Sequence, residues 1–69
     1  MNKEKAEALA ENLKGLACIE CTKNWLAKYE GLTDPIQDIR DCAALGFITL
    51  ELQERLVDEI KTIKLSSNQ

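Results

Sequence analysis

The chain has 69 residues, 45% of them hydrophobic and 30% charged, and its 12 acidic residues outnumber its 9 basic ones. This length predicts one helical domain over residues 1–69, with little apolar burial to spare. A net charge of −3 disfavours nucleic-acid binding, which relies on Lys and Arg to neutralise phosphates. No apolar run approaches the roughly 20 residues of a membrane span, and no secretory signal opens the sequence. Three cysteines are an odd number, so we expect a reducing compartment, the cytoplasm.

Residues 2–30 have helical periodicity and predict an N-terminal helix that starts at Asn2 and stops before Gly31. Two apolar stripes run along it, the first made of Ala6, Leu9, Leu13 and Leu16, the second of Cys18, Cys21, Trp25 and Tyr29. At about 100° per residue, the two stripes point roughly 160° apart around a continuous helix.

The change of direction falls beside Gly15, which allows two interpretations. Gly15 either ends a helix, which gives four short helices in all, or lies in one long helix, straight or kinked there, that buries opposite faces in its two halves. We favour the long helix because no Ser, Thr, Asp or Asn lies between Gly15 and Cys21 to cap a new one.

A helix is expected over residues 35–45, because Asp34 can cap it and Pro35 suits its first turn. Gln37 occupies the capping-box position, and Gly46 is placed to end the helix.

The last helix is expected over residues 50–65, capped by Thr49, with a frayed tail at 66–69. Its apolar stripe consists of Leu52, Leu56, Ile60 and Ile63. The short connection between the last two helices predicts a helical hairpin. The fold class is therefore all-α, a three-helix bundle in which the long N-terminal helix packs on this hairpin.

This hairpin covers about half of an N-terminal helix that is about 43 Å long at 1.5 Å per residue. The other half has its own apolar face, and a second copy of the chain is the simplest cover for it. We therefore expect a homodimer.

Cys18 and Cys21 form a CxxC pair, which can be a redox dithiol or half of a zinc site. Redox pairs of this kind lie at a helix N-terminus, whereas this pair falls inside the predicted long helix. A zinc site would need Cys42 with a carboxylate, or a second chain, because the sequence has no His. Buried free cysteines are the favoured interpretation, and we expect no cofactor, no metal and no catalytic residue.

Trp25 and Tyr29 lie one helical turn apart and either fill the core or anchor a partner, since both residue types favour interfaces. The predicted interaction surface is Cys18, Cys21, Trp25 and Tyr29.

The segment 36–60, with Gly46-Phe47-Ile48-Thr49 in its turn, resembles the helical hairpin of SHOCT (short C-terminal) domains. It departs from that family's pattern at Leu52 and Gln53, where the family has an acid and an aromatic. The resemblance covers about a third of the chain and implies no function.

These features predict a non-catalytic protein–protein interaction module, such as a bacterial or phage regulator, adaptor or inhibitor. One alternative is a dimeric DNA-binding regulator that uses the 50–65 helix, although Glu51 and Glu54 at its front would face phosphate. The other is a thiol or metal sensor that works through Cys18 and Cys21.

Overall fold

The computed structural model describes residues 2–29 and 34–67, except for the side chains of Ser66 and Ser67. Within these ranges the chain forms four α-helices and no strand: α1 (Lys3–Lys14), α2 (Ile19–Ala27), α3 (Pro35–Ala44) and α4 (Leu50–Ser67). The prediction of an all-α fold is confirmed. The expected helix stop before Gly31 and the last two residues of the tail lie outside the described residues.

The prediction of one long N-terminal helix is wrong, because the chain leaves the helical conformation between α1 and α2. Gly15 is the C-cap of α1, and its N–H bonds to the carbonyl oxygen of Asn12 at 3.2 Å. Cys18 then adopts extended backbone, with φ −153° and ψ 169°, and its sulfur caps α2. A cysteine thus supplies the N-cap that the sequence pattern lacked.

The C-terminal hairpin follows the predicted caps. Asp34 accepts a hydrogen bond from the N–H of Ile36 at 3.0 Å, and Thr49 Oγ1 accepts one from the N–H of Leu52 at 3.1 Å. Gly46 has φ 84°, the left-handed conformation that suits glycine after a helix. Gln37 departs from the capping-box prediction, because its Nε2 donates to Asp41 one turn further along α3.

Helix α4 extends beyond its predicted end. The backbone stays helical to Ser67, two residues past the expected stop at Leu65. Residues 66 and 67 of the expected frayed tail are therefore helical.

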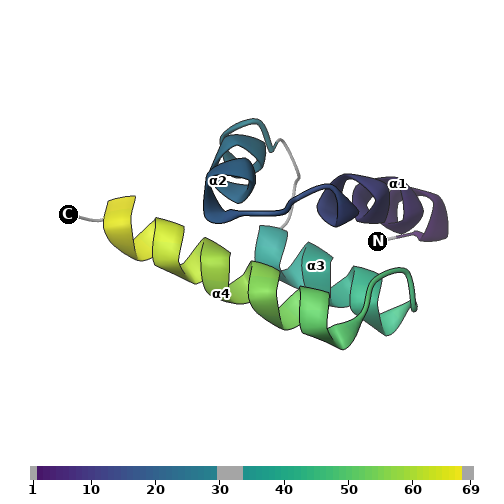
Figure 1. Cartoon of the computed structure of the whole chain (residues 1–69). Helices are drawn as coiled ribbons and strands as arrows, with labels where there is room; N and C mark the ends of the chain where they lie inside the picture. The colour runs from purple at the N-terminus through teal and green to yellow at the C-terminus, as the bar shows by residue number, and fades with distance from the viewer. Residues whose placement is uncertain (1, 30–33, 68–69) are drawn as a thin grey trace.

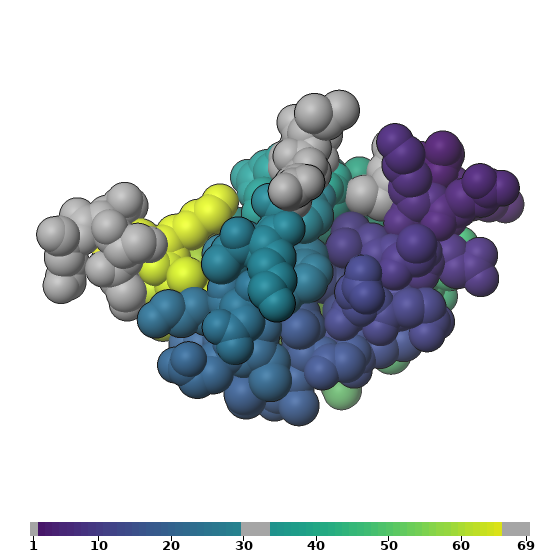
Figure 2. Space-filling view, turned by 90° about the horizontal axis from the view of Figure 1, so that it is seen from above, coloured from purple at the N-terminus to yellow at the C-terminus, as the bar shows by residue number. Residues whose placement is uncertain are grey.

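The four helices form two layers (Figure 1). The α3–α4 hairpin makes one layer, and α1 and α2 make the other, with α1 packed on α3 and α2 packed on α4. Figure 2 looks onto the α1–α2 layer, with the C-terminal end of α4 emerging beyond α2. No helix in the described ranges is long and apolar enough to cross a membrane.

A single core lies between these layers. Its fully buried large side chains include Leu13 from α1, Ile39 from α3 and Leu56 and Ile60 from α4. Leu9 and Trp25, which would face opposite ways on a continuous helix, both pack against this core. The break after Gly15 therefore turns Leu9 and Trp25, one from each apolar stripe, toward the same core, so a second copy is not required to cover either of them.

Candidate functional site

The break between α1 and α2 places two cysteines at the start of a helix. Cys18 Sγ accepts a hydrogen bond from the N–H of Cys21 at 3.4 Å, as an N-cap side chain does. The two Sγ atoms lie 3.1 Å apart, about 1 Å more than the length of a disulfide bond. Cys18 is exposed, Cys21 is half-buried, and both are free thiols. The two residues form a dithiol that reagents in solution can reach.

The hydrogen bonds at this helix start favour the thiolate form of Cys18. The side-chain hydrogen bond between Cys18 and Cys21 lowers the pKa of Cys18 most, followed by the bond from the backbone N–H of Cys21. The N–H of Glu20 acts in the same direction, whereas desolvation and the charge of Glu20 act against it. Thiolate is the nucleophilic and metal-binding form of cysteine, so the site has the electrostatics of a reactive thiol.

Cys42 provides the contrast within the same chain. It is buried in the core, and its Sγ donates to the carbonyl oxygen of Ala6 at 3.4 Å. Burial raises the pKa of Cys42, and the nearby charges of Asp38 and Asp41 raise it further. This thiol is therefore protected, as expected for a cysteine that packs as a small apolar residue.

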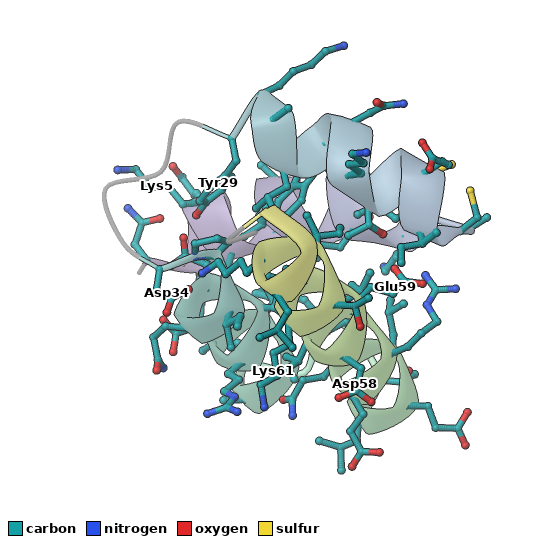
Figure 3. The ribbon with its side chains drawn as sticks, turned by 90° about the vertical axis from the view of Figure 1, so that its left-hand side faces the viewer. Lys5, Tyr29, Asp34, Asp58, Glu59 and Lys61 are labelled. Carbon is teal, nitrogen blue, oxygen red and sulfur yellow. The ribbon has the colours of Figure 1, made fainter. Side chains whose placement is uncertain are left out.

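Polar contacts with α4 fix the start of α2. Thr22 is fully buried, and its hydroxyl donates to the carboxylate of Glu59 at 2.5 Å, while lying 3.1 Å from the carbonyl oxygen of Cys18. Arg55 Nη2 donates to the carbonyl oxygen of Leu16 in the connection before α2. Figure 3 shows Glu59 on the side of α4 toward α2, whereas Asp58 and Lys61 point away from α2. The backbone that carries Cys18 is thus held in place from α4.

Trp25 and Tyr29 lie at the other end of α2. Their rings are in contact, with centroids 5.0 Å apart and planes tilted by 39°. Both side chains are half-buried, and Trp25 packs against the core. Both aromatic side chains are thus partly buried and partly exposed, which is compatible with either predicted role, filling the core or contacting a partner.

The four residues of the predicted interaction surface all belong to α2 and the residues that flank it. The structure brings them together in two pairs, Cys18 with Cys21 and Trp25 with Tyr29. The expectation that the CxxC pair lies inside a helix is wrong, because Cys18 caps α2. The expectation that all three cysteines are buried is wrong for Cys18, which is exposed, and Cys21 is only half-buried.

Sequence patterns gave no indication of the contacts that Thr22 and Arg55 make between helices. Thr22 is separated by 37 residues from Glu59, its carboxylate partner. Thr22 and Glu59 are ordinary helical residues, and no sequence motif indicates that their side chains are in contact. A polar residue on the inward face of α2, four positions after Cys18, is the one signal that could have drawn attention to Thr22.

Other parts of the described chain offer less chemistry. Among residues 2–29 and 34–67, no three His, Cys, Asp or Glu side chains gather in a way that would hold a metal ion. A hollow of about 360 Å³ between α3 and α4 is lined by both signs of charge. Its lining residues are Arg40, Gln53, Glu54, Val57, Asp58 and Lys61. Leu45 and Leu50 are exposed on either side of the α3–α4 turn.

Compared with protein-family models, curated proteins and solved structures, the chain matches none of them. The functional proposal below therefore depends on the geometry of the dithiol and its surroundings.

Proposed function

We propose that this chain is a small thiol sensor whose Cys18–Cys21 dithiol forms a reversible intramolecular disulfide. The 3.1 Å separation of the two Sγ atoms is the observation that carries the proposal. The exposure of Cys18 supports it, because the attacking thiol must reach its oxidant. The anchoring of the α2 start by Glu59 and Arg55 supports it as well, since the two sulfurs stay close without a large movement of the backbone.

The chemistry is an exchange with a small disulfide such as oxidised glutathione. The Cys18 thiolate attacks one sulfur of the small disulfide, forms a mixed disulfide and releases one thiolate. The Cys21 thiolate then attacks the Cys18 sulfur, which closes the intramolecular disulfide and releases the second thiolate. The chain loses two electrons and two protons, and the small disulfide becomes two thiols.

Incubation with oxidised glutathione, followed by peptide mapping, tests this function. We expect one Cys18–Cys21 disulfide per chain, reversed by a dithiol reductant, with Cys42 left free. The Cys21→Ser variant should instead accumulate glutathione on Cys18, because the resolving thiol is missing. A disulfide that joins two chains, or one that includes Cys42, would contradict the proposal.

A second candidate is a non-catalytic protein–protein interaction module that uses α2. The partly exposed ring pair of Trp25 and Tyr29 favours it, and Ile19 on the same helix is 43% exposed. If α2 is the contact surface, a partner captured from the native host by the wild type should be lost with Tyr29→Ala. Leu65→Ala is the control because Leu65 is exposed on α4. Equal capture by the wild type and Tyr29→Ala would remove this candidate.

Two further expectations concern DNA binding and a cytoplasmic location. A DNA-binding role gains no support, because the front of α4 exposes Glu51 and Glu54, which phosphate would repel. A cytoplasmic location fits the proposed sensor, since the reducing poise of that compartment keeps exposed thiols reduced until an oxidant appears.

A further inference from the structure

We propose that the Cys18–Cys21 dithiol binds one monovalent copper ion, Cu(I), between its two sulfur atoms. The inference rests on the same two thiols as the proposed function, but it involves no oxidation of the chain. Binding replaces the two thiol protons by one metal ion, so the protons go to solvent and no electron moves.

The donor set selects the class of metal. Thiolate sulfur is a soft ligand, which favours Cu(I), zinc and iron–sulfur clusters over magnesium, calcium and manganese. The two sulfurs come from residues three apart at the start of one helix, and they already lie 3.1 Å from each other. Rotation about χ1 of the exposed Cys18 can widen this separation to admit an ion, with no change in the backbone.

The number of ligands then separates copper from zinc. Structural zinc sites take four ligands and catalytic ones take three protein ligands. The sequence has no His, and in the described ranges no third Cys, Asp or Glu gathers with the pair. Cys42 is buried in the core against Ala6 and does not face the dithiol. Two thiolates with no further protein ligand suit Cu(I), which accepts linear two-coordination.

The charge of the product fits its position. Two thiolates and one Cu(I) carry a net charge of −1, and the N-terminus of a helix stabilises negative charge. The N–H of Cys21 already points at Cys18 Sγ, at 3.4 Å. The N–H groups at the N-terminus of α2 would stabilise the bis-thiolate complex, whereas the charge of Glu20, which lies between the two cysteines, opposes it. The helix start therefore provides both the ligands and part of the charge compensation.

A competition experiment tests the site. The reduced protein is titrated without oxygen against a chromophoric Cu(I) chelator such as bicinchoninate, with the metal supplied as its acetonitrile complex. We expect the wild type to withdraw one equivalent of copper per chain and X-ray absorption to report two sulfur neighbours. Cys18→Ser and Cys21→Ser should each lose this binding, and Cys42→Ser should keep it. Circular dichroism checks that each variant remains helical, and serine at position 18 preserves the capping interaction.

Several outcomes would overturn the proposal. The wild type would fail to withdraw copper, Cys18→Ser would withdraw as much copper as the wild type, or X-ray absorption would report three sulfur neighbours around the metal. Half an equivalent per chain together with a dimer in sedimentation would also overturn it, because the ion would then join two chains. Withdrawal of Zn(II) from a zinc chelator with the same dependence on Cys18 and Cys21 would show that the site is not specific to monovalent copper.

The copper site and the thiol sensor can fail separately. Disulfide formation with oxidised glutathione is measured on metal-free protein, and copper binding is measured under reducing conditions. Copper binding without disulfide formation would reject the sensor and retain the metal site. Disulfide formation without copper binding would reject the metal site and retain the sensor.

Discussion

Cys18 both caps α2 and presents a thiol to solvent. Its sulfur accepts the hydrogen bond from the N–H of Cys21, a role that the oxygen of Ser, Thr, Asp or Asn usually performs. Sulfur is a weaker acceptor than a hydroxyl oxygen. Cys18 is therefore expected to cap α2 less strongly than serine would at the same position.

Substitutions at Cys18 should separate these two roles. We expect Cys18→Ser to raise the urea midpoint of unfolding, because a hydroxyl caps better than a thiol, and Cys18→Ala to lower it, because the capping contact is lost. Neither variant should form the proposed Cys18–Cys21 disulfide, because each lacks the Cys18 thiol. Urea titrations followed by circular dichroism measure the order of the three midpoints. An alanine variant as stable as the serine variant would show that residue 18 does not cap a helix.

Alkylation rates should separate Cys18 from Cys42. In native protein we expect iodoacetamide to modify Cys18 first, and the rate at Cys18 to rise at lower pH than the rate at Cys42. The thiolate is the reacting form of cysteine. Hydrogen bonds with the side chain and backbone of Cys21 lower the pKa of Cys18, whereas burial raises the pKa of Cys42. Mass spectrometry of peptides over a range of pH values gives both rates. In urea the two rates should converge, and native rates that are already equal would contradict the structure.

Helix α2 is held to α4 by a polar contact in a partly buried position. The Thr22 hydroxyl donates to Glu59, whose side chain is 17% exposed, and Glu59 also lies 3.8 Å from the guanidinium of Arg55. Removal of the hydroxyl leaves a largely desolvated carboxylate oxygen without that donor. Thr22 lies one helical turn after Cys18, so loss of its contact with Glu59 should also make the backbone that carries the dithiol less firmly held.

Thr22→Val tests this contact. We expect a loss of about 1–3 kcal/mol in the free energy of unfolding, the usual cost of leaving a buried polar partner unsatisfied. Thr62→Val is the matched control, because Thr62 is exposed and its hydroxyl bonds to the carbonyl of Asp58 within α4. The control should change stability by no more than about 0.5 kcal/mol. Equal effects of the two substitutions in urea unfolding would show that Thr22 does not join the helices.

The hairpin of α3 and α4 could be predicted from sequence because its signals are local. Asp34 and Thr49 cap with oxygen atoms, and Gly46 takes the positive φ that glycine permits. The start of α2 could not be predicted in this way, because a cysteine cap is not among the preferred residue types. The sequence pattern identified the two cysteines, but neither the cap that fixes their geometry nor the contacts of Thr22 and Arg55 that hold the start of α2.

At the scale of the whole molecule, the break after Gly15 lets a chain of 69 residues form one core. The principal dimensions are 36 × 24 × 16 Å, and α1 and α2 lie over the hairpin in a second layer. A continuous N-terminal helix would have left one apolar stripe outside this core.

Truncation of a fully buried side chain in this shared core should therefore lower the free energy of unfolding. We expect Leu56→Ala to lower the free energy of unfolding by about 2–5 kcal/mol, because Leu56 is fully buried. Leu50→Ala on the same helix should change it by no more than about 0.5 kcal/mol, since Leu50 is 68% exposed. Urea unfolding of the two variants compares them directly. Similar losses would mean that α4 is packed on a different face.

The homodimer stays a prediction, although the long N-terminal helix with an uncovered apolar face, from which it was inferred, is not formed. Of the large apolar side chains that the structure describes, Ile19, Leu45, Leu50 and Leu65 are exposed. These side chains offer an apolar contact to a second copy, and Leu45 and Leu50 flank one turn. Sedimentation equilibrium should then give twice the 7.8 kDa chain mass for the wild type and the chain mass for Leu50→Glu. A wild type at the single-chain mass would reject the dimer.

The central claim is that α1 ends at Gly15 and that Cys18 starts a new helix, which places the dithiol at a helix N-terminus. Backbone ¹³C chemical shifts of the reduced protein in solution test it most directly, residue by residue. The account predicts helical shifts up to Lys14 and again from Ile19, with non-helical shifts at residues 16–18. Uninterrupted helical shifts from Asn12 to Thr22 would contradict it.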